Sequence, residues 1–234
     1  MPKKKRIGVV ELRENFIVGC KFINKVRREY CYKFTTLGLD PAISSFGYCL
    51  RKNIKVGNIV PKSWGFSRLI HIESEIRALL EKRSPFVILE DYAYNSVYGR
   101  EKAGELGGIV RRILYFKKLP LLTVAPLSVK AWIKAKKKSQ IMLEILDQHG
   151  IKIDNEDAAD AFLLSDIGHK ALLIAKDVTS KRLEGTDILG YLKNEDYQSR
   201  NGLKKIYKYQ AQLLFRLISS RGKNVKFFSH KNPF

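Results

Sequence analysis

Two aspartates, Asp157 and Asp160, stand three residues apart in a stretch that is otherwise mostly apolar. Residues at this spacing lie on one face of a helix, so the two carboxylates would point toward the same place. Such a pair needs a proton or a cation between its members. The alternative is that both aspartates only mark a helix N-terminus, where carboxylates interact favourably with the helix dipole and the exposed amides.

Two further acids, Asp40 and Glu90, each end a short apolar run that is typical of a buried strand. An ionised group in that position is costly unless it is paired, and converging carboxylates without a matching base suit a hard cation such as Mg²⁺. Four carboxylates from three separate elements predict a two-metal site. The expected metal ligands are Asp40, Glu90, Asp157 and Asp160.

Geometry separates these acids from their neighbours in the sequence. Asp91 directly follows Glu90, and adjacent strand residues point to opposite faces of a sheet. Glu156 can approach only one member of the aspartate pair. Asp154 and Asp166 are expected at most to support the ligands from outside the site.

The chain is strongly basic, with 44 Lys and Arg against 23 Asp and Glu and a formal net charge of +21 over 234 residues. The excess is +7 in residues 1–33, +6 in 34–170 and +8 in 171–234. A polyanion is the expected partner, with nucleic acid favoured over an anionic membrane. The basic flanks are expected to contact phosphate while the middle segment carries the chemistry. There is no apolar run long enough to span a membrane.

Other kinds of site are disfavoured by the residue types present. Three cysteines without a C-x-x-C spacing argue against a disulfide framework or a structural zinc site, and fit a reducing compartment. The four histidines form neither an H-E-x-x-H pattern nor a catalytic triad. Residues 3–6, Lys-Lys-Lys-Arg, resemble a nuclear-import signal, although a disordered arm that contacts phosphate is the favoured interpretation.

The pattern of apolar residues predicts an α/β fold. Strands are expected at 34–39, 45–51, 54–60, a run ending at Glu90, and 121–125; helices at 67–83, 100–118, 139–149, 156–175 and 202–220. Three consecutive strands followed by alternating helices and strands favour a mixed sheet. Gly104, Gly107 and Gly108 lower the helix propensity of 100–118, and we expect them to allow close packing on the sheet.

The ordered motifs of residues 34–170 resemble the RuvC-type Holliday-junction resolvases of the ribonuclease H-like superfamily. The segments that carry the resemblance are 37–41 with 46–48, 67–69, 87–90, 105–110, 129–130, 138–140 and 157–161. Pro41-Ala42-Ile43 departs from the glycine or serine usual after the first acid, and the additions at both ends are absent from the bacterial family. A phage or other mobile-element version is compatible with these departures.

This resemblance implies a ribonuclease H-like fold with a mixed five-stranded sheet flanked by helices. The expected division is a basic N-terminal extension at 1–33, the nuclease domain at 34–175 and a basic, partly helical C-terminal extension at 176–234. It further implies a homodimer that binds a four-way DNA junction and nicks two opposed strands symmetrically. Mg²⁺ is the implied cofactor, with Mn²⁺ as a substitute and no small-molecule cofactor, and no membrane association is expected.

The resemblance also suggests which residues contact DNA. Lys138 is expected to stabilise developing charge at phosphorus, with Lys130 as a second candidate. The expected DNA-binding residues are Lys130, Lys134, Lys136, Lys137, Lys138, Tyr92, Tyr94 and Arg100. A solvated basic face is the alternative for the lysines, and core packing is the alternative for the two tyrosines, because the family's aromatic position falls on Ala93.

Two other functions remain open at this point. One is a YqgF-like nuclease that acts on RNA or another structured nucleic acid, and the other is a non-catalytic DNA-binding protein whose acids are helix caps. The expected location is the cytoplasm of a bacterium or of a phage-infected host, and the basic start is compatible with nuclear or organellar import.

Overall fold

The computed structural model describes residues 9–29, 35–42, 44–62, 65–81, 85–91, 100–135, 137–180, 208–219 and 225–226. A six-stranded sheet lies at the centre, in the order β3-β2-β1-β4-β5-β6. Its strands are β1 Thr36–Asp40, β2 Phe46–Leu50, β3 Lys55–Ile59, β4 Phe86–Glu90, β5 Leu121–Val124 and β6 Val225–Lys226. The helices are α1 Val9–Glu29, α2 Phe66–Leu79, α3 Arg100–Phe116, α4 Pro126–Ile133, α5 Lys138–His149, α6 Glu156–Ser180 and α9 Lys208–Ser219, with a short 3₁₀ turn η1 at Arg51–Asn53.

The sheet is mixed, as the sequence predicts. β1, β2 and β3 form an antiparallel meander, while β4 pairs in parallel with both β1 and β5. Helices connect the parallel strands, because a parallel pair needs a long crossover whereas an antiparallel pair needs only a turn. The predicted α/β fold, with a mixed five-stranded sheet flanked by helices, is confirmed. The two-residue β6, which pairs antiparallel with β5, adds a sixth strand that was not predicted.

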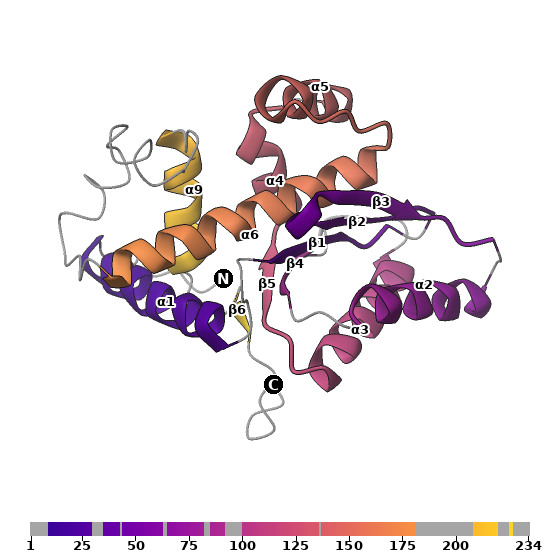
Figure 1. The fold of residues 1–234 in the computed structure, drawn as a ribbon, viewed down its shortest axis with the longest axis horizontal. Helices are drawn as coiled ribbons and strands as arrows, with labels where there is room; N and C mark the ends of the chain where they lie inside the picture. Colours follow the sequence, from indigo (N-terminus) through magenta and orange to yellow (C-terminus); the bar gives the residue numbers. More distant parts are fainter. Residues whose placement is uncertain are drawn as a thin grey trace, which may run out of the picture.

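Helices cover both faces of the sheet, with α2 and α3 on one side and α6 on the other (Figure 1). Side chains alternate between the two faces of each strand, and β2, β4 and β5 each contribute to both cores. Leu37 and Leu39 of β1 belong to the core beneath α2 and α3. Phe86 and Ile88 of β4 belong to the core that contains α6. The face of a strand residue therefore follows from its position in this alternation.

Glycines bring α6 unusually close to the sheet. A Cβ at Gly38 of β1 would overlap the carbonyl oxygen of Ala161, and one at Gly47 of β2 would overlap that of Asp157. On the helix side, a Cβ at Gly168 would overlap the side chain of Ile88. The backbone of the helix thus rests directly on the strands, which fixes its height and register above them.

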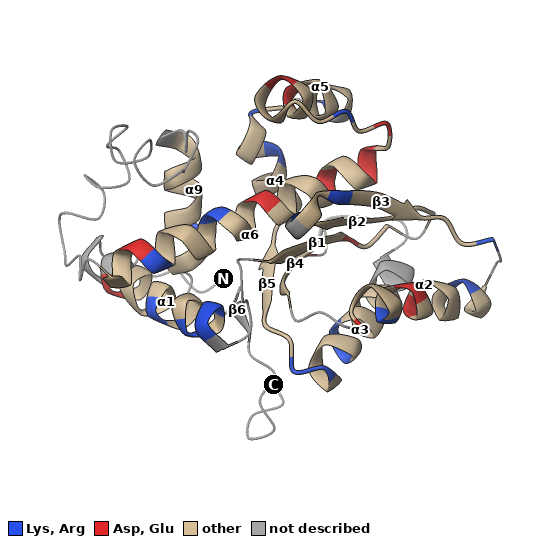
Figure 2. Cartoon of the chain, viewed as in Figure 1, with Lys and Arg blue, Asp and Glu red and all other residues tan. Residues whose placement is uncertain are grey.

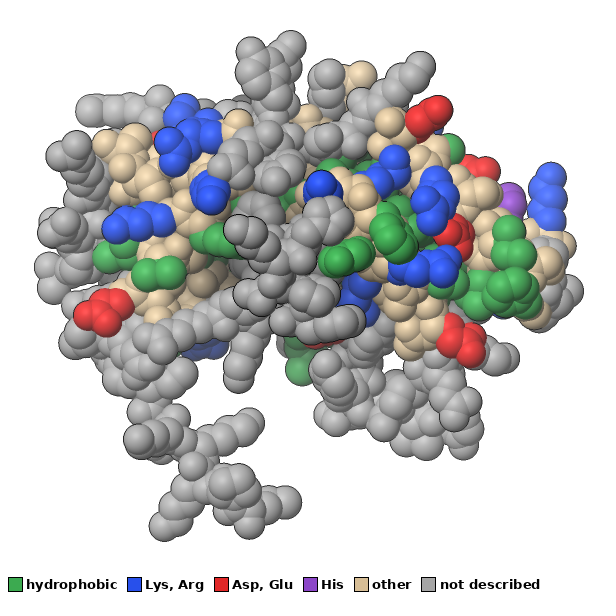
Figure 3. Space-filling model, turned by 90° about the horizontal axis from the view of Figure 1, so that it is seen from below, with side chains coloured by type: hydrophobic (Ala, Val, Ile, Leu, Met, Phe, Trp, Pro, Cys, Tyr) green, Lys and Arg blue, Asp and Glu red, His purple; other side chains and the backbone are tan. Residues whose placement is uncertain are grey.

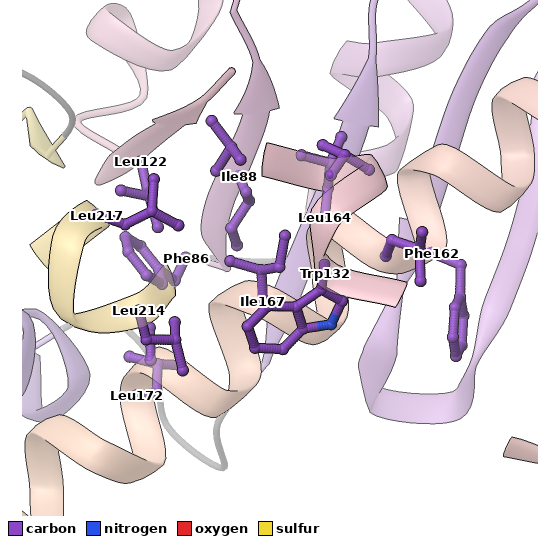
Figure 4. Close-up of a cluster of buried hydrophobic side chains, with 14 of the residues drawn as sticks. Phe86, Ile88, Leu122, Trp132, Phe162, Leu164, Ile167, Leu172, Leu214 and Leu217 are labelled. Carbon is purple, nitrogen blue, oxygen red and sulfur yellow. The ribbon is translucent and has the colours of Figure 1, made fainter. Parts of the chain in front are cut away.

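Two helices from the predicted extensions complete the core on the α6 side. The rings of Phe16 in α1 and Phe215 in α9 lie 4.9 Å apart, and Gly19 of α1 sits where a Cβ would overlap Ile218 of α9. Figure 4 shows Leu214 and Leu217 of α9 grouped with buried side chains of the sheet and of α6. α6 itself continues to Ser180, beyond the boundary predicted at 175.

Two helices and the surroundings of two glycines differ from what the sequence predicts. α1 and α4 were not predicted as helices, although Pro126 at the first position of α4 is a common start signal. The expectation that α3 packs closely through its glycines is wrong for Gly104 and Gly108, where an added Cβ would meet no atom within 4 Å.

None of the described helices combines the length and apolar composition that a membrane span requires.

Candidate active site

The strand register brings Asp40 and Glu90 to the same edge of the sheet. β1 and β4 are parallel neighbours with Gly38 opposite Ile88, so the residue two positions further along each strand lies on the same face and at the same end. Gly38 contacts α6, and Ile88 lies against Gly168 of α6. Asp40 and Glu90 are therefore carried toward the α6 side at the carboxyl ends of two adjacent strands.

α6 brings the aspartate pair to this same edge. Thr36, at the start of β1, places its hydroxyl 3.0 Å from both the carbonyl oxygen and the hydroxyl oxygen of Ser165 in α6. Two residues further along β1, Gly38 faces Ala161, which lies one turn before Ser165 in the helix. The helix therefore runs antiparallel to β1, and its first two turns lie near the end of that strand. Figure 2 shows acidic positions in this N-terminal part of α6.

Electrostatics at Asp40 shows that the four carboxylates interact. Burial raises the pKa of Asp40 well above its ordinary value, and a side-chain hydrogen bond with Glu90 and repulsion from Glu90, Asp160 and Asp157 raise it further. Asp40 and Asp160 are both buried, whereas Glu90 and Asp157 are half-buried. Each of these influences raises the pKa of Asp40, as expected for carboxylates that lie close together.

The start of α6 is capped by Asn155. Its side-chain oxygen accepts a 2.9 Å hydrogen bond from the backbone amide of Ala158, and its carbonyl accepts one from Ala159. Asn155 thereby fills the role that a helix-start interpretation would assign to an aspartate. Asp157 is the second residue of α6 and Asp160 the fifth, so neither occupies the capping position.

The donor set at this edge has the chemistry that Mg²⁺ requires. Carboxylate oxygens are its preferred protein ligands, and the mutual repulsion that raises the pKa of Asp40 is what a bound cation would relieve. Within the described residues, no group of three or more His, Cys, Asp or Glu side chains is already arranged to hold a metal ion.

The acids set aside on geometric grounds lie elsewhere. Asp91 pairs with Arg111 of α3 at 3.2 Å, which lies on the opposite side of the sheet from α6. Asp154 is exposed and lies 3.5 Å from Lys152. Glu156 is exposed at the first position of α6. These placements agree with the reasoning that separated them from the four candidate ligands.

Asp166 has a role that the sequence did not indicate. It is fully buried and contacts the guanidinium of Arg51 at 2.9 Å, the ammonium of Lys170 at 3.0 Å and the indole nitrogen of Trp132 at 3.0 Å. Burial alone would raise its pKa, but Lys170, Arg51 and His149 together lower the pKa to about 2. This group joins η1, α4 and α6 inside the core. It is an internal ion cluster, and its contacts with Arg51, Lys170 and Trp132 do not include the four acids.

The predicted DNA contacts are described only in part. Lys130, Lys134 and Lys137 are exposed on α4 and the turn that follows it, and the ammonium of Lys134 lies 4.3 Å from the ring centroid of Tyr209 in α9. Lys138 and Arg100 begin α5 and α3, but their side chains are outside the described part of the structure. Tyr92, Tyr94 and Lys136 lie outside the described residues altogether.

Comparisons with known proteins give a likeness of structure. No family model matches the sequence, and no curated protein matches it. A structure titled "T. thermophilus RuvC in complex with Holliday junction substrate" is similar to this chain with a TM-score of 0.47 and 19% identity, covering 59% of this chain and 93% of that one. The Thermus thermophilus RuvC structure has a TM-score of 0.48 and 18% identity, covering 61% and 96%. About two fifths of the present chain lies outside each match.

Proposed function

We propose that this protein is a Mg²⁺-dependent endonuclease that acts on branched DNA, with the four-way junction as its substrate. The observation that supports this most directly is the electrostatic coupling of Asp40 with Glu90, Asp157 and Asp160 at one edge of the sheet. An acidic cluster would repel a phosphodiester on its own, whereas the chain as a whole carries a net charge of +21 that attracts one. A bound cation reconciles these two properties. The order of motifs described above supports the choice of a junction as substrate.

The four carboxylates have distinct parts in this proposal. Burial and the neighbouring carboxylates raise the pKa of Asp40, so this group keeps its proton to a higher pH than an ordinary aspartate. That proton must leave before Asp40 can act as an anionic ligand, so activity is expected to rise with pH. Asp157 and Asp160 complete the set from α6. When bound, Mg²⁺ would activate a water molecule and stabilise the charge that develops on the phosphate oxygens.

A paired cut on opposed strands needs two active sites, so we propose that the protein works as a homodimer. Lys138 is proposed to stabilise developing charge, and the exposed lysines Lys130, Lys134 and Lys137 to attract the DNA backbone. If six to ten phosphates are engaged, affinity should fall by roughly 10³–10⁵ between 50 and 200 mM salt. Size-exclusion chromatography with light scattering tests the dimer.

The nuclease activity is tested with a synthetic four-way junction in the presence of Mg²⁺. The wild-type chain should nick two opposed strands at symmetric positions, and Asp157→Asn should lose nicking while it retains junction binding. Asp154→Asn is a matched control, because it removes the same charge three residues earlier from a side chain that is 81% exposed. The control should nick at the wild-type rate. Normal nicking by Asp157→Asn would contradict the assignment of the site.

Substrate choice separates the proposal from its alternatives. Linear duplex, flap and single-stranded DNA, and structured RNA, are compared with the junction under the same conditions. Preferential cutting of RNA would favour a YqgF-like activity. Binding without any cutting by the wild-type chain would favour a DNA-binding protein that lacks catalysis.

A further inference from the structure

The outer surface of α1 carries a row of basic side chains. Lys21, Lys25 and Arg28 are exposed and follow one another at spacings of four and three residues, which places them along one side of the helix. Every described side chain that is exposed between positions 21 and 28 is basic. In Figure 3, Lys and Arg side chains lie on the left, the side of the molecule on which α1 lies, and also on the right. We call Lys21, Lys25 and Arg28 the α1 basic row.

The opposite side of α1 is firmly packed, so the position of this row is fixed. Phe16, Cys20 and Ile23 are fully buried in the core shared with α6 and α9. Asn24 donates a 2.6 Å hydrogen bond to the hydroxyl of Thr179 near the end of α6. The row therefore belongs to a docked helix and keeps a constant relation to the rest of the protein.

α6 connects this row to the candidate active site. Asp157 and Asp160 lie at the start of α6 and Thr179 at its end, within one continuous helix. At 1.5 Å per residue, the 19 to 22 residues between them span roughly 28–33 Å. Along a duplex with a rise of about 3.4 Å per base pair, this length corresponds to roughly 8–10 base pairs.

We propose that the α1 basic row binds the phosphate backbone of a duplex arm about 8–10 base pairs from the phosphodiester that is cut. The row spans about 10 Å, close to the rise of three base pairs, so its three cations can meet successive phosphates of one strand. Contacts to phosphate position a protein on DNA and carry no sequence information. The row would thus hold the arm in place while the acids act near the branch point. This inference rests on the proposed nuclease function, because the distance is measured from its active site.

The test compares four-way junctions with long and short arms. Lys21→Gln, Lys25→Gln and Arg28→Gln are combined in the Asp157→Asn chain, so that binding is measured without cutting. The substrates have arms of about 20 or about 6 base pairs closed by hairpin loops, lengths chosen on either side of the 8–10 base pairs expected from the helix geometry. On long arms, the slope of log affinity against log salt concentration should be less negative by about 2.7 in the triple variant than in the parent chain. Between 50 and 200 mM salt, the parent chain should therefore lose about 40-fold more affinity than the triple variant. On short arms, the two chains should bind alike.

A control triple variant removes the same charge from the other side of the sheet. Arg77→Gln, Arg112→Gln and Lys118→Gln alter exposed side chains on α2, on α3 and in the turn after α3. This variant should show no dependence on arm length. The proposal would be overturned if the α1 triple variant lost as much binding affinity on short arms as on long arms. It would also be overturned if the two triple variants lost affinity equally. If the wild-type chain cuts no junction but the arm-length effect persists, the nuclease function fails and the α1 basic row stands as a duplex-binding surface.

Discussion

The close approach of α6 to the sheet predicts that Gly38→Ala impairs both stability and catalysis. The new Cβ would lie 2.6 Å from the backbone nitrogen of Ser165, and closer still to the carbonyl oxygen of Ala161. Ordinary contact begins near 3.4 Å, so the helix and the strand must separate by at least about 0.8 Å. Both obstructing atoms belong to backbone, which cannot rotate away as a side chain would. We expect a loss of about 1–3 kcal/mol in the free energy of unfolding.

The same displacement carries Asp157 and Asp160 away from Asp40. A misplacement of about 1 Å commonly costs about 100-fold in rate, so single-turnover nicking of a four-way junction should slow by about that factor. Gly108→Ala in α3 is the matched control, because its added Cβ meets no atom within 4 Å. This control should gain about 0.5–1 kcal/mol of stability and nick normally. Urea unfolding and nicking rates are measured on both variants. Wild-type stability in Gly38→Ala would refute the close approach, and a destabilised variant that nicks normally would refute its catalytic consequence.

Three further substitutions test the electrostatics and the helix start. Asp40→Asn should abolish nicking yet raise the free energy of unfolding by about 0.5–2 kcal/mol at neutral pH, because the raised pKa of Asp40 means that its ionised form destabilises the fold. This gain, measured by urea unfolding, should shrink as the pH falls from the raised pKa of Asp40 into the ordinary aspartate range, and it should be absent below that range. Asp166→Asn should cost about 3–5 kcal/mol, since it leaves Arg51 and Lys170 buried without their anion. Because the pKa of Asp166 is lowered to about 2, its ionised form contributes about 2 kcal/mol to the free energy of unfolding above pH 4. This contribution should disappear as the pH falls to about 2. Acid unfolding curves should show the loss in the wild type but not in Asp166→Asn. Asn155→Ala should lower the free energy of unfolding by about 1 kcal/mol, the usual contribution of a helix cap, and thermal unfolding should show a correspondingly lower midpoint.

Much of the sheet and its acids could be predicted because the signals are local. Runs of apolar residues that end in Asp40 and Glu90 identify two strands and also place the acids at their ends. The three-residue spacing of Asp157 and Asp160 needs only helical geometry. Strand alternation was enough to separate Asp91 from Glu90, and Asp91 pairs with Arg111 in the structure.

The remaining features depend on contacts between distant parts of the chain. Asp166 is paired with Arg51, which lies more than a hundred residues earlier, and no local pattern shows that relation. α1 does carry a helical pattern in Phe16, Cys20, Ile23 and Val26, but the basic composition of this segment obscured it. Gly38 and Gly47 gave a usable signal, because glycine inside a strand often marks close backbone approach.

The shared core of α1, α6 and α9 has a consequence for how the protein is made. Buried residues of α9, including Leu214 and Leu217, pack in the same cluster as those of α6. The ribosome finishes α6 at Ser180 and α9 only at Ser219. At 5–20 residues per second this interval is about 2–8 s. During that time the helix that bears Asp157 and Asp160 lacks the part of its packing that α9 supplies, so the core around α6 is complete only after α9 has been synthesised.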